Sequence, residues 1–99
     1  MRVSVVVCEH SMDRYEDFQE AVDSLLAQTY DDTEIVLVSD GNDTVCEHIR
    51  EDYIETDGVL VHCLDENLGL LGARNAGAEA ATGDVVAFID DDAIADESW

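Results

Sequence analysis

The sequence predicts an α/β fold in which a doubly wound parallel sheet is covered by helices on both faces. Four short runs of β-branched and other apolar residues have the length and composition of buried strands. Helical patterns separate these runs, which gives the order β-α-β-α-β-α-β with short connections. Parallel strands need crossover connections, and strands that are apolar on both faces need cover on both faces. The predicted strands are Val3–Val7, Glu34–Val38, Val59–Cys63 and Val85–Ile89.

Each of the three intervening segments has a helical pattern. In the first, apolar residues recur at three- and four-residue steps, and Asp13 with Glu16 forms a capping box. Thr44 and Glu47 have the same relation in the second segment. The third is rich in alanine and is closed by Gly83. The predicted helices are Asp13–Gln28, Thr44–Ile54 and Leu70–Ala81.

The net charge of the chain predicts that the protein works at high salt concentration. Its 99 residues have the length of one domain and a formal net charge of −21, and all four basic residues are arginine. This charge indicates a salt-loving organism with a salty cytosol, because a Debye length of about 3 Å at molar salt removes most of the self-repulsion. It also argues against nucleic acid as a partner.

The chain carries no recognisable membrane or secretory segment. Its apolar runs are far shorter than the ~20 residues that a spanning helix needs, and the opening run has only one arginine before it. We therefore expect a cytoplasmic location. The sequence leaves open whether the full-length protein lies at the cytoplasmic face of a membrane.

The cysteines and histidines give no sign of a disulfide framework, a zinc site or a catalytic histidine. The cysteines are odd in number and lack CxxC spacing, so we expect buried or half-buried thiols. No histidine has a second ligand at helical spacing. These residues are Cys8, Cys46, Cys63, His10, His48 and His62.

Acidic residues follow the second and fourth predicted strands, at the edge of the sheet where doubly wound folds bind ligands. Asp40 precedes a glycine turn that presents it above the sheet, although a plain turn and helix cap is the better explanation of this segment taken alone. After Ile89, Asp90 and Asp92 point the same way in an extended backbone, and Asp91 points oppositely. Two convergent carboxylates suit Mg²⁺ or Mn²⁺, but an acidic surface loop is nearly as good an interpretation.

A glycine-containing segment precedes the third helix. Gly69 and Gly72 stand at the start of that helix, and Arg74 lies on its first turns. A helix N-terminus with a guanidinium attracts phosphate. The pattern fits neither GxGxxG nor a P-loop, so it is weak by itself.

Taken together, these segments resemble the amino-terminal half of a family-2 glycosyltransferase, an inverting nucleotide-diphosphosugar transferase with a Rossmann-like GT-A fold. The resemblance covers essentially all 99 residues. It is carried by "VSVVVCEHSMDR", "SLLAQTY", "EIVLVSDGND", "NLGLLGARNAG" and "GDVVAFIDDD".

The resemblance implies roles for particular residues. Asp40 matches the acidic residue that contacts the nucleobase, and Arg74 matches an arginine on the sugar-nucleotide side of the cleft. Cys8, Glu9 and His10 stand where the family usually has a proline and a polar or aromatic residue that help to hold the base. The family's Asp-x-Asp matches Asp90, expected near the ribose and the metal, and Asp92, expected on the metal. Gly69 and Asp91 complete the substrate-binding residues that we expect.

The reaction that the resemblance implies is inverting sugar transfer from a nucleotide-diphosphosugar donor to a hydroxyl of a glycan or lipid-linked sugar, with Mg²⁺ or Mn²⁺. The family's catalytic base lies beyond residue 99, so residues 1–99 are expected to be the donor-binding half of a truncated domain without its acceptor-binding half. Such a half is expected to be inactive alone, and to self-associate through the open edge of Val85–Ile89.

Two other functions stay open. The first is a noncatalytic module that binds a nucleotide or a divalent cation, with Asp90–Asp92 as acidic surface. The second is a phosphotransfer domain, either a haloacid-dehalogenase-like hydrolase or a receiver. Ala93 and Ile94 do not fit the hydrolase motif, and the chain has no lysine for a receiver.

The charge predicts that the chain needs salt to fold. At 0.1 M salt the Debye length is about 10 Å, so its acidic groups repel one another strongly. Thermal melting from low to multimolar KCl is expected to show a steep rise in midpoint. A midpoint that does not change with KCl would contradict the halophilic interpretation.

Overall fold

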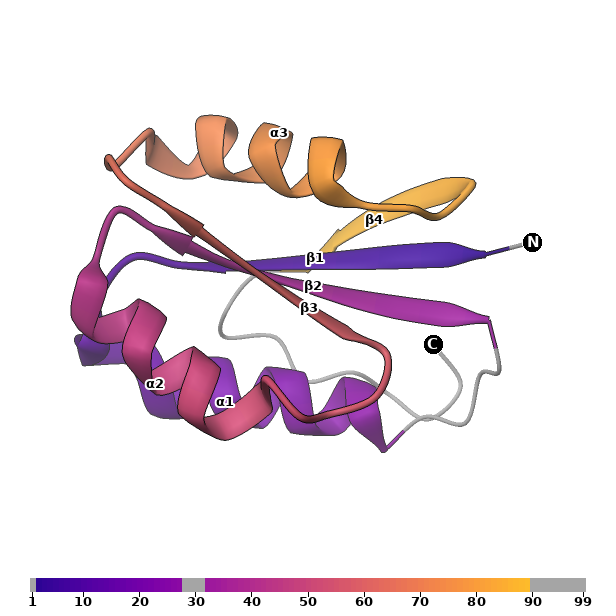
Figure 1. Ribbon diagram of the computed structural model, residues 1–99, viewed down its shortest axis with the longest axis horizontal. Helices are drawn as coiled ribbons and strands as arrows, with labels where there is room; N and C mark the ends of the chain where they lie inside the picture. The colour runs from indigo at the N-terminus through magenta and orange to yellow at the C-terminus, as the bar shows by residue number, and fades with distance from the viewer. Residues whose placement is uncertain (1, 28–31, 90–99) are drawn as a thin grey trace.

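The computed structural model describes residues 2–27 and 32–89, and it confirms the predicted fold class (Figure 1). Four parallel strands form one sheet in the order β3-β2-β1-β4. The chain therefore builds β1, β2 and β3 in one direction and then returns to place β4 on the other side of β1. The strands are β1 Val3–Glu9, β2 Thr33–Asp40, β3 Val59–Leu64 and β4 Val85–Ile89.

The three helices lie where the sequence predicts them, but their first residues and caps differ from the prediction. A 3₁₀ turn, Met12–Arg14, precedes α1. Ser11 caps this turn, because its Oγ accepts from the Asp13 N–H at 3.1 Å, so the prediction that Asp13 is the cap is wrong. Asn42, not Thr44, caps α2. The prediction rested on spacing to a glutamate, whereas the actual caps lie two residues earlier and accept from backbone N–H groups two or three residues further on. The helices are α1 Tyr15–Leu26, α2 Asp43–Tyr53 and α3 Gly69–Ala80.

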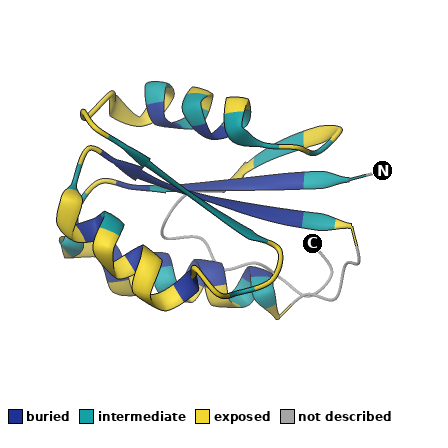
Figure 2. Ribbon diagram, in the orientation of Figure 1, coloured by how far each residue is buried: buried dark blue, intermediate teal, exposed yellow. Residues whose placement is uncertain are grey.

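Helices cover both faces of the sheet, as the unbroken apolar strands require (Figures 1 and 2). On one face α1 and α2 pack against the larger core cluster, in which Val5, Val7 and Leu37 meet Phe18 and Ile49. On the other face α3 packs on a smaller cluster. Its members are Val6, Val36, Val38 and Ala73.

Small residues bring α3 close to the sheet. Ala73 is fully buried, and a Cβ added to Gly77 would lie 2.5 Å from Val6 Cγ1 and 3.0 Å from Val38 Cγ2. The helix can therefore approach the strands only where it carries no bulky side chain. This explains why a helix with so much alanine and glycine packs in this layer. The C-cap of α3 is Ala81, so the prediction that Gly83 closes the helix is wrong.

Strand β4 pairs with β1 through Val3↔Val85 to Val7↔Ile89, and in the described part of the chain it forms one edge of the sheet. Val85 is 43 % exposed and Phe88 is 44 % exposed. This agrees with the open edge expected from the sequence, and self-association through it stays a prediction. None of the helices among the described residues is long and apolar enough to cross a membrane.

A buried polar network joins β1, β2 and β4 at the amino ends of the strands. The Ser4 hydroxyl donates to Glu34 Oε2 at 2.7 Å and accepts from the Gly83 N–H at 2.8 Å. Thr82 donates to Glu34 through both its N–H and its hydroxyl. Burial alone would raise the pKa of Glu34, but hydrogen bonds from Thr82 and Ser4, with a nearby guanidinium, hold it below its ordinary value. The network fixes the chain as it enters β4.

The structure contains a disulfide between Cys46 and Cys63, so the prediction that these two cysteines are thiols is wrong. Cys46 lies on the first turn of α2 and Cys63 near the end of β3, and their Cα atoms are 5.8 Å apart. Spacing alone could not reveal the pair, because it is the packing of α2 beside β3 that brings the two residues together. Cys8 is half-buried, as predicted, and lies outside the disulfide.

The disulfide predicts the number of reactive thiols in the denatured chain and a contribution to the free energy of unfolding. Without reductant, the denatured chain is expected to show one reactive thiol, and Cys8→Ala is expected to show none. The bond closes a loop with a sequence separation of 17, so the double variant Cys46→Ala/Cys63→Ala is expected to lose about 2–4 kcal/mol of unfolding free energy. Thiol titration and denaturant unfolding check both points, and three reactive thiols in the wild type would contradict the bond.

Candidate functional site

A pocket of about 470 Å³ lies at the carboxyl ends of the strands, next to the point where the strand order reverses between β1 and β4. This is the place where doubly wound sheets bind ligands. The pocket brings together five residues that the sequence predicts as substrate-binding. They are Cys8, Glu9, Asp40, Gly69 and Arg74.

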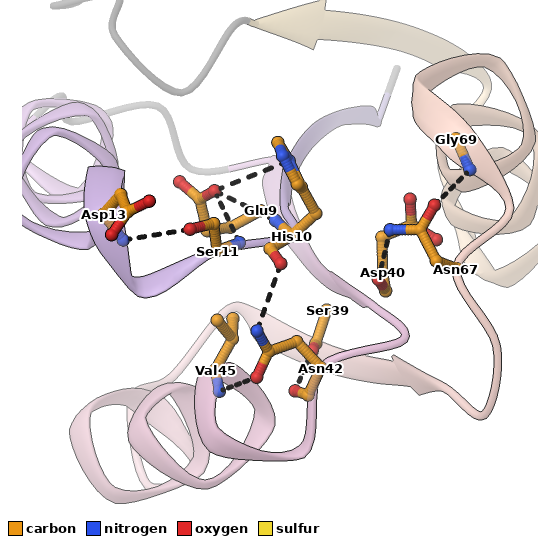
Figure 3. A network of polar contacts seen from close by, with 10 residues as sticks. All are labelled: Glu9, His10, Ser11, Asp13, Ser39, Asp40, Asn42, Val45, Asn67 and Gly69. Atoms are coloured by element: carbon orange, nitrogen blue, oxygen red, sulfur yellow. Dashed lines mark hydrogen bonds and ion pairs between the residues drawn. The ribbon is translucent and has the colours of Figure 1, made fainter.

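The end of β1 forms one wall through Glu9 and His10. Glu9 is buried, and its Oε1 accepts from the N–H groups of His10 at 2.9 Å and Ser11 at 3.2 Å (Figure 3). The His10 side chain is 63 % exposed, and its Nδ1 lies 3.9 Å from the same oxygen. Glu9 thus holds the backbone turn after β1, and His10 is the exposed side chain of this wall.

The end of β2 is fastened to the loop after β3 through Asp40. Asp40 is 3 % exposed, and its Oδ1 accepts from the Leu68 N–H at 2.7 Å. Its backbone carbonyl accepts from Asn67 Nδ2 at 3.1 Å, and Asn67 Oδ1 in turn accepts from the Gly69 N–H (Figure 3). The carboxylate predicted to meet the base therefore also holds the entry to α3.

Gly41 lets these two loops touch. Its φ is 72°, and a Cβ built on it would lie 2.2 Å from the Asn67 nitrogen and 2.5 Å from the Glu66 carbonyl carbon. No side chain fits between two backbones at that distance. A glycine is therefore required here both for the backbone angle and for the space.

Asn42 connects the same turn to β1 and to α2. Its Oδ1 accepts from the N–H groups of Thr44 and Val45, which caps α2. Its Nδ2 donates to the His10 carbonyl at 3.2 Å, and Figure 3 shows this bond and the one from Val45. The loops after β1, β2 and β3 therefore form one connected rim. The alternative interpretation of this segment as a turn and helix cap is correct, since Asn42 caps α2. That role of the turn does not exclude a binding role for Asp40.

Two of the chain's four basic residues, Arg14 and Arg74, line this pocket. In a chain with 25 acidic residues, this places much of the positive charge at one point. The N-terminus of α3 also lies at the pocket, through Gly69 and Leu70. A helix N-terminus and guanidinium groups both favour an anionic ligand such as a phosphate.

The predicted metal ligands Asp90 and Asp92, and Asp91 between them, lie outside the described residues. Among residues 2–27 and 32–89, no group of three or more His, Cys, Asp or Glu side chains could hold a metal ion. Ile89, the last residue of β4, lines the pocket, and the three aspartates follow it directly in sequence. Carboxylate oxygens are the ligands that Mg²⁺ and Mn²⁺ prefer.

Sequence reasoning did not single out Arg14, Asn67 or Ile89, and it gave His10 a low weight. Arg14 had a usable signal, because a basic residue is rare in this chain and this one follows the first strand closely. Asn67 had none, since its contacts depend on how two loops meet.

Comparison with known proteins decides the family. Residues 4–99 match the family described as Glycosyl transferase family 2. The chain belongs to this family. The family-2 chain is 54 % identical over 99 residues to "Glucosyl-dolichyl phosphate glucuronosyltransferase" of Haloferax volcanii, which covers all of this chain and 32 % of that relative. It is 39 % identical over 90 residues to "Uncharacterized glycosyltransferase EpsJ" of Bacillus subtilis, covering 26 % of it.

Solved structures agree with the GT-A fold. S. aureus TarS 1–349 has a TM-score of 0.80 and 27 % identity, covering 99 % of this chain and 29 % of TarS. TarS has also been solved with UDP-GlcNAc, at a TM-score of 0.74. The mannosyltransferase PcManGT from Pyrobaculum calidifontis, solved with GDP-Man and Mn²⁺, has a TM-score of 0.74 and 25 % identity, covering 94 % and 28 %. The family-2 chain thus spans about a third of the length of these proteins.

The loop contact at Gly41 predicts a strong and specific effect of one added methyl group. Gly41→Ala and Gly58→Ala both place alanine at a positive φ, 72° and 81°, which costs about 1–2 kcal/mol. The nearest atom to a Cβ on Gly58 is 3.7 Å away, so only Gly41→Ala also forces two backbones apart. We expect it to cost about 1–3 kcal/mol more in denaturant unfolding. Equal losses in the two variants would contradict the close contact.

Proposed function

We propose that the pocket binds a nucleotide-diphosphosugar together with Mg²⁺ or Mn²⁺, as the donor side of an inverting glycosyltransferase. The observation that carries this proposal is the pocket itself, which places Asp40, Arg14 and Arg74 at the carboxyl ends of the strands in a family-2 chain. The structurally similar proteins TarS and PcManGT have been solved with UDP-GlcNAc and with GDP-Man and Mn²⁺, respectively.

Different residues of the pocket are proposed to bind different parts of the donor. Asp40 lies at the wall formed by β2, and its carboxylate accepts from the Leu68 N–H through Oδ1, so an acceptor of this kind suits the N–H groups on the edge of a nucleobase. Cys8, Glu9 and His10 form the adjoining wall. Arg74 and the N-terminus of α3 at Gly69 suit the diphosphate, because both attract negative charge.

Asp90, Asp91 and Asp92 complete the donor site in this proposal, with Asp90 near the ribose and Asp92 as a metal ligand. The bound cation would supply electrostatic stabilisation of the charge that grows on the leaving nucleoside diphosphate. The chain's own side chains orient the donor, and the two arginines offset the charge of the diphosphate. Asp91 is proposed as a further substrate-binding residue.

We propose that the acceptor site and the general base come from parts of the protein outside residues 1–99. The relatives are about three times as long as this chain, which supports the view that it corresponds to a donor-binding half. The acceptor class that we favour is a lipid-linked sugar, because a relative 54 % identical to this chain is named a glucosyl-dolichyl phosphate glucuronosyltransferase. By this proposal the 99-residue chain binds donor but does not transfer sugar.

Calorimetric titration with UDP and GDP in multimolar KCl, with and without Mn²⁺, tests the proposal. One of the two is expected to bind, and to bind at least about tenfold more tightly with Mn²⁺. Asp92→Asn is expected to remove that gain and leave the melting midpoint unchanged. The matched control is Asp17→Asn, which makes the same change on an exposed position of α1 and should keep the gain.

Three results would contradict parts of this assignment. If neither nucleotide binds, the donor site is wrong. If Asp92→Asn keeps the full Mn²⁺ dependence, Asp92 is not a metal ligand. Sugar transfer by the 99-residue chain alone would show that it already contains a base and an acceptor site.

A further inference from the structure

One aromatic ring contacts a cation at the rim of the pocket. The Arg74 guanidinium carbon lies 5.7 Å from the centre of the Phe88 ring, within the range of a cation–π interaction. Arg74 is half-buried on α3, and Phe88 is 44 % exposed on β4. Arg74 lines the pocket, and Phe88 directly precedes Ile89, which also lines it.

The contact follows from the packing of α3 on β1 and β2, because β4 lies next to β1 in the sheet. Val86 packs into the smaller core cluster with Ala73, and alternation along a strand places Phe88 on the same face as Val86. Ala73 is buried against the sheet, so the next residue on the helix, Arg74, leaves α3 close to that face. The ring and the guanidinium are therefore brought together by backbone elements that are fixed elsewhere.

We propose that Phe88 is a positioning residue, whose ring holds the Arg74 guanidinium at the pocket in the orientation that receives the donor diphosphate. This inference rests on the proposed function. It adds a role for a residue on β4 that does not itself need to touch the ligand.

The chemistry of the ring suits this role. An aromatic ring attracts a cation without carrying a net charge of its own. A cation over a ring face forms no hydrogen bond with the ring, so the contact with Phe88 itself occupies none of the N–H donors of the guanidinium.

The exposure of Phe88 supports the same reading. An aliphatic residue such as leucine would serve a half-exposed position on a strand equally well if packing alone were needed. The role proposed here needs the π face in particular. Replacing Phe88 by leucine, tyrosine or tryptophan therefore distinguishes a need for packing alone from a need for an aromatic ring.

The experiment compares Phe88→Leu with Phe88→Tyr and Phe88→Trp in multimolar KCl with Mg²⁺. For each variant, affinities are measured for the nucleoside diphosphate that binds the wild type, UDP or GDP, and for the matching nucleoside. Phe88→Leu is expected to weaken diphosphate binding about three- to tenfold and leave nucleoside binding unchanged. Phe88→Tyr and Phe88→Trp are expected to stay within about twofold of the wild type.

Val85→Ala is the matched control. Val85 lies on the same strand and is 43 % exposed, against 44 % for Phe88, but it points to the opposite face. It is expected to leave both affinities unchanged. A Phe88→Leu variant that loses diphosphate and nucleoside binding equally, or loses neither, overturns the inference. Loss in the tyrosine and tryptophan variants equal to that in Phe88→Leu also overturns it.

A measurement on the wild type keeps the inference testable if Phe88→Leu does not fold. The Arg74 Hδ protons are expected to resonate upfield of their random-coil position through the ring current of Phe88, and to stay upfield when the nucleoside diphosphate binds. Unshifted Hδ protons in the bound state overturn the inference while leaving the proposed function intact. Failure of the wild type to bind UDP or GDP overturns the proposed function, and this inference falls with it.

Discussion

The site depends on the backbone contact between the loop after β2 and the loop after β3. Gly41 lies so close to Asn67 that no side chain fits between them, and Asp40 binds the Leu68 N–H at 2.7 Å. Asn42 extends the connection to the carbonyl of His10. These contacts fix three loops at once, so the pocket is largely formed before any ligand enters. Preorganised groups of this kind cost little reorganisation on binding.

The arginines at the pocket provide positive groups for the anionic donor that we propose, despite the acidic composition of the chain. A body with a formal charge of −21 repels a diphosphate at long range, yet two of its four arginines line this one pocket. At high salt the Debye length is about 3 Å, so long-range repulsion is screened while direct contacts inside the pocket persist. The high charge and the anionic ligand are therefore compatible in the salty environment that the composition indicates.

Periodicity and residue type were enough to predict the strand runs, the helix positions and the parallel sheet, because these follow from local pattern and from the need to cover both faces. They were also enough to place Asp40, Gly69 and Arg74 at one edge, since parallel strands end together. The capping residues Ser11 and Asn42 were missed, although each accepts from backbone N–H groups only two or three residues further on, because spacing to a glutamate was given more weight. The disulfide and the role of Asn67 were also missed, and these two depend on where one element meets another, which no local pattern in the sequence shows.

The buried network around Glu34 has a consequence for how this fold tolerates insertions and deletions. Ser4 and Thr82 fix the entry to β4, and so set which residue of β4 lies opposite each residue of β1. A strand that slips by one residue exchanges its two faces. Deleting one residue just before β4 would therefore turn Phe88 away from α3, although the change lies at the opposite edge of the sheet from the pocket.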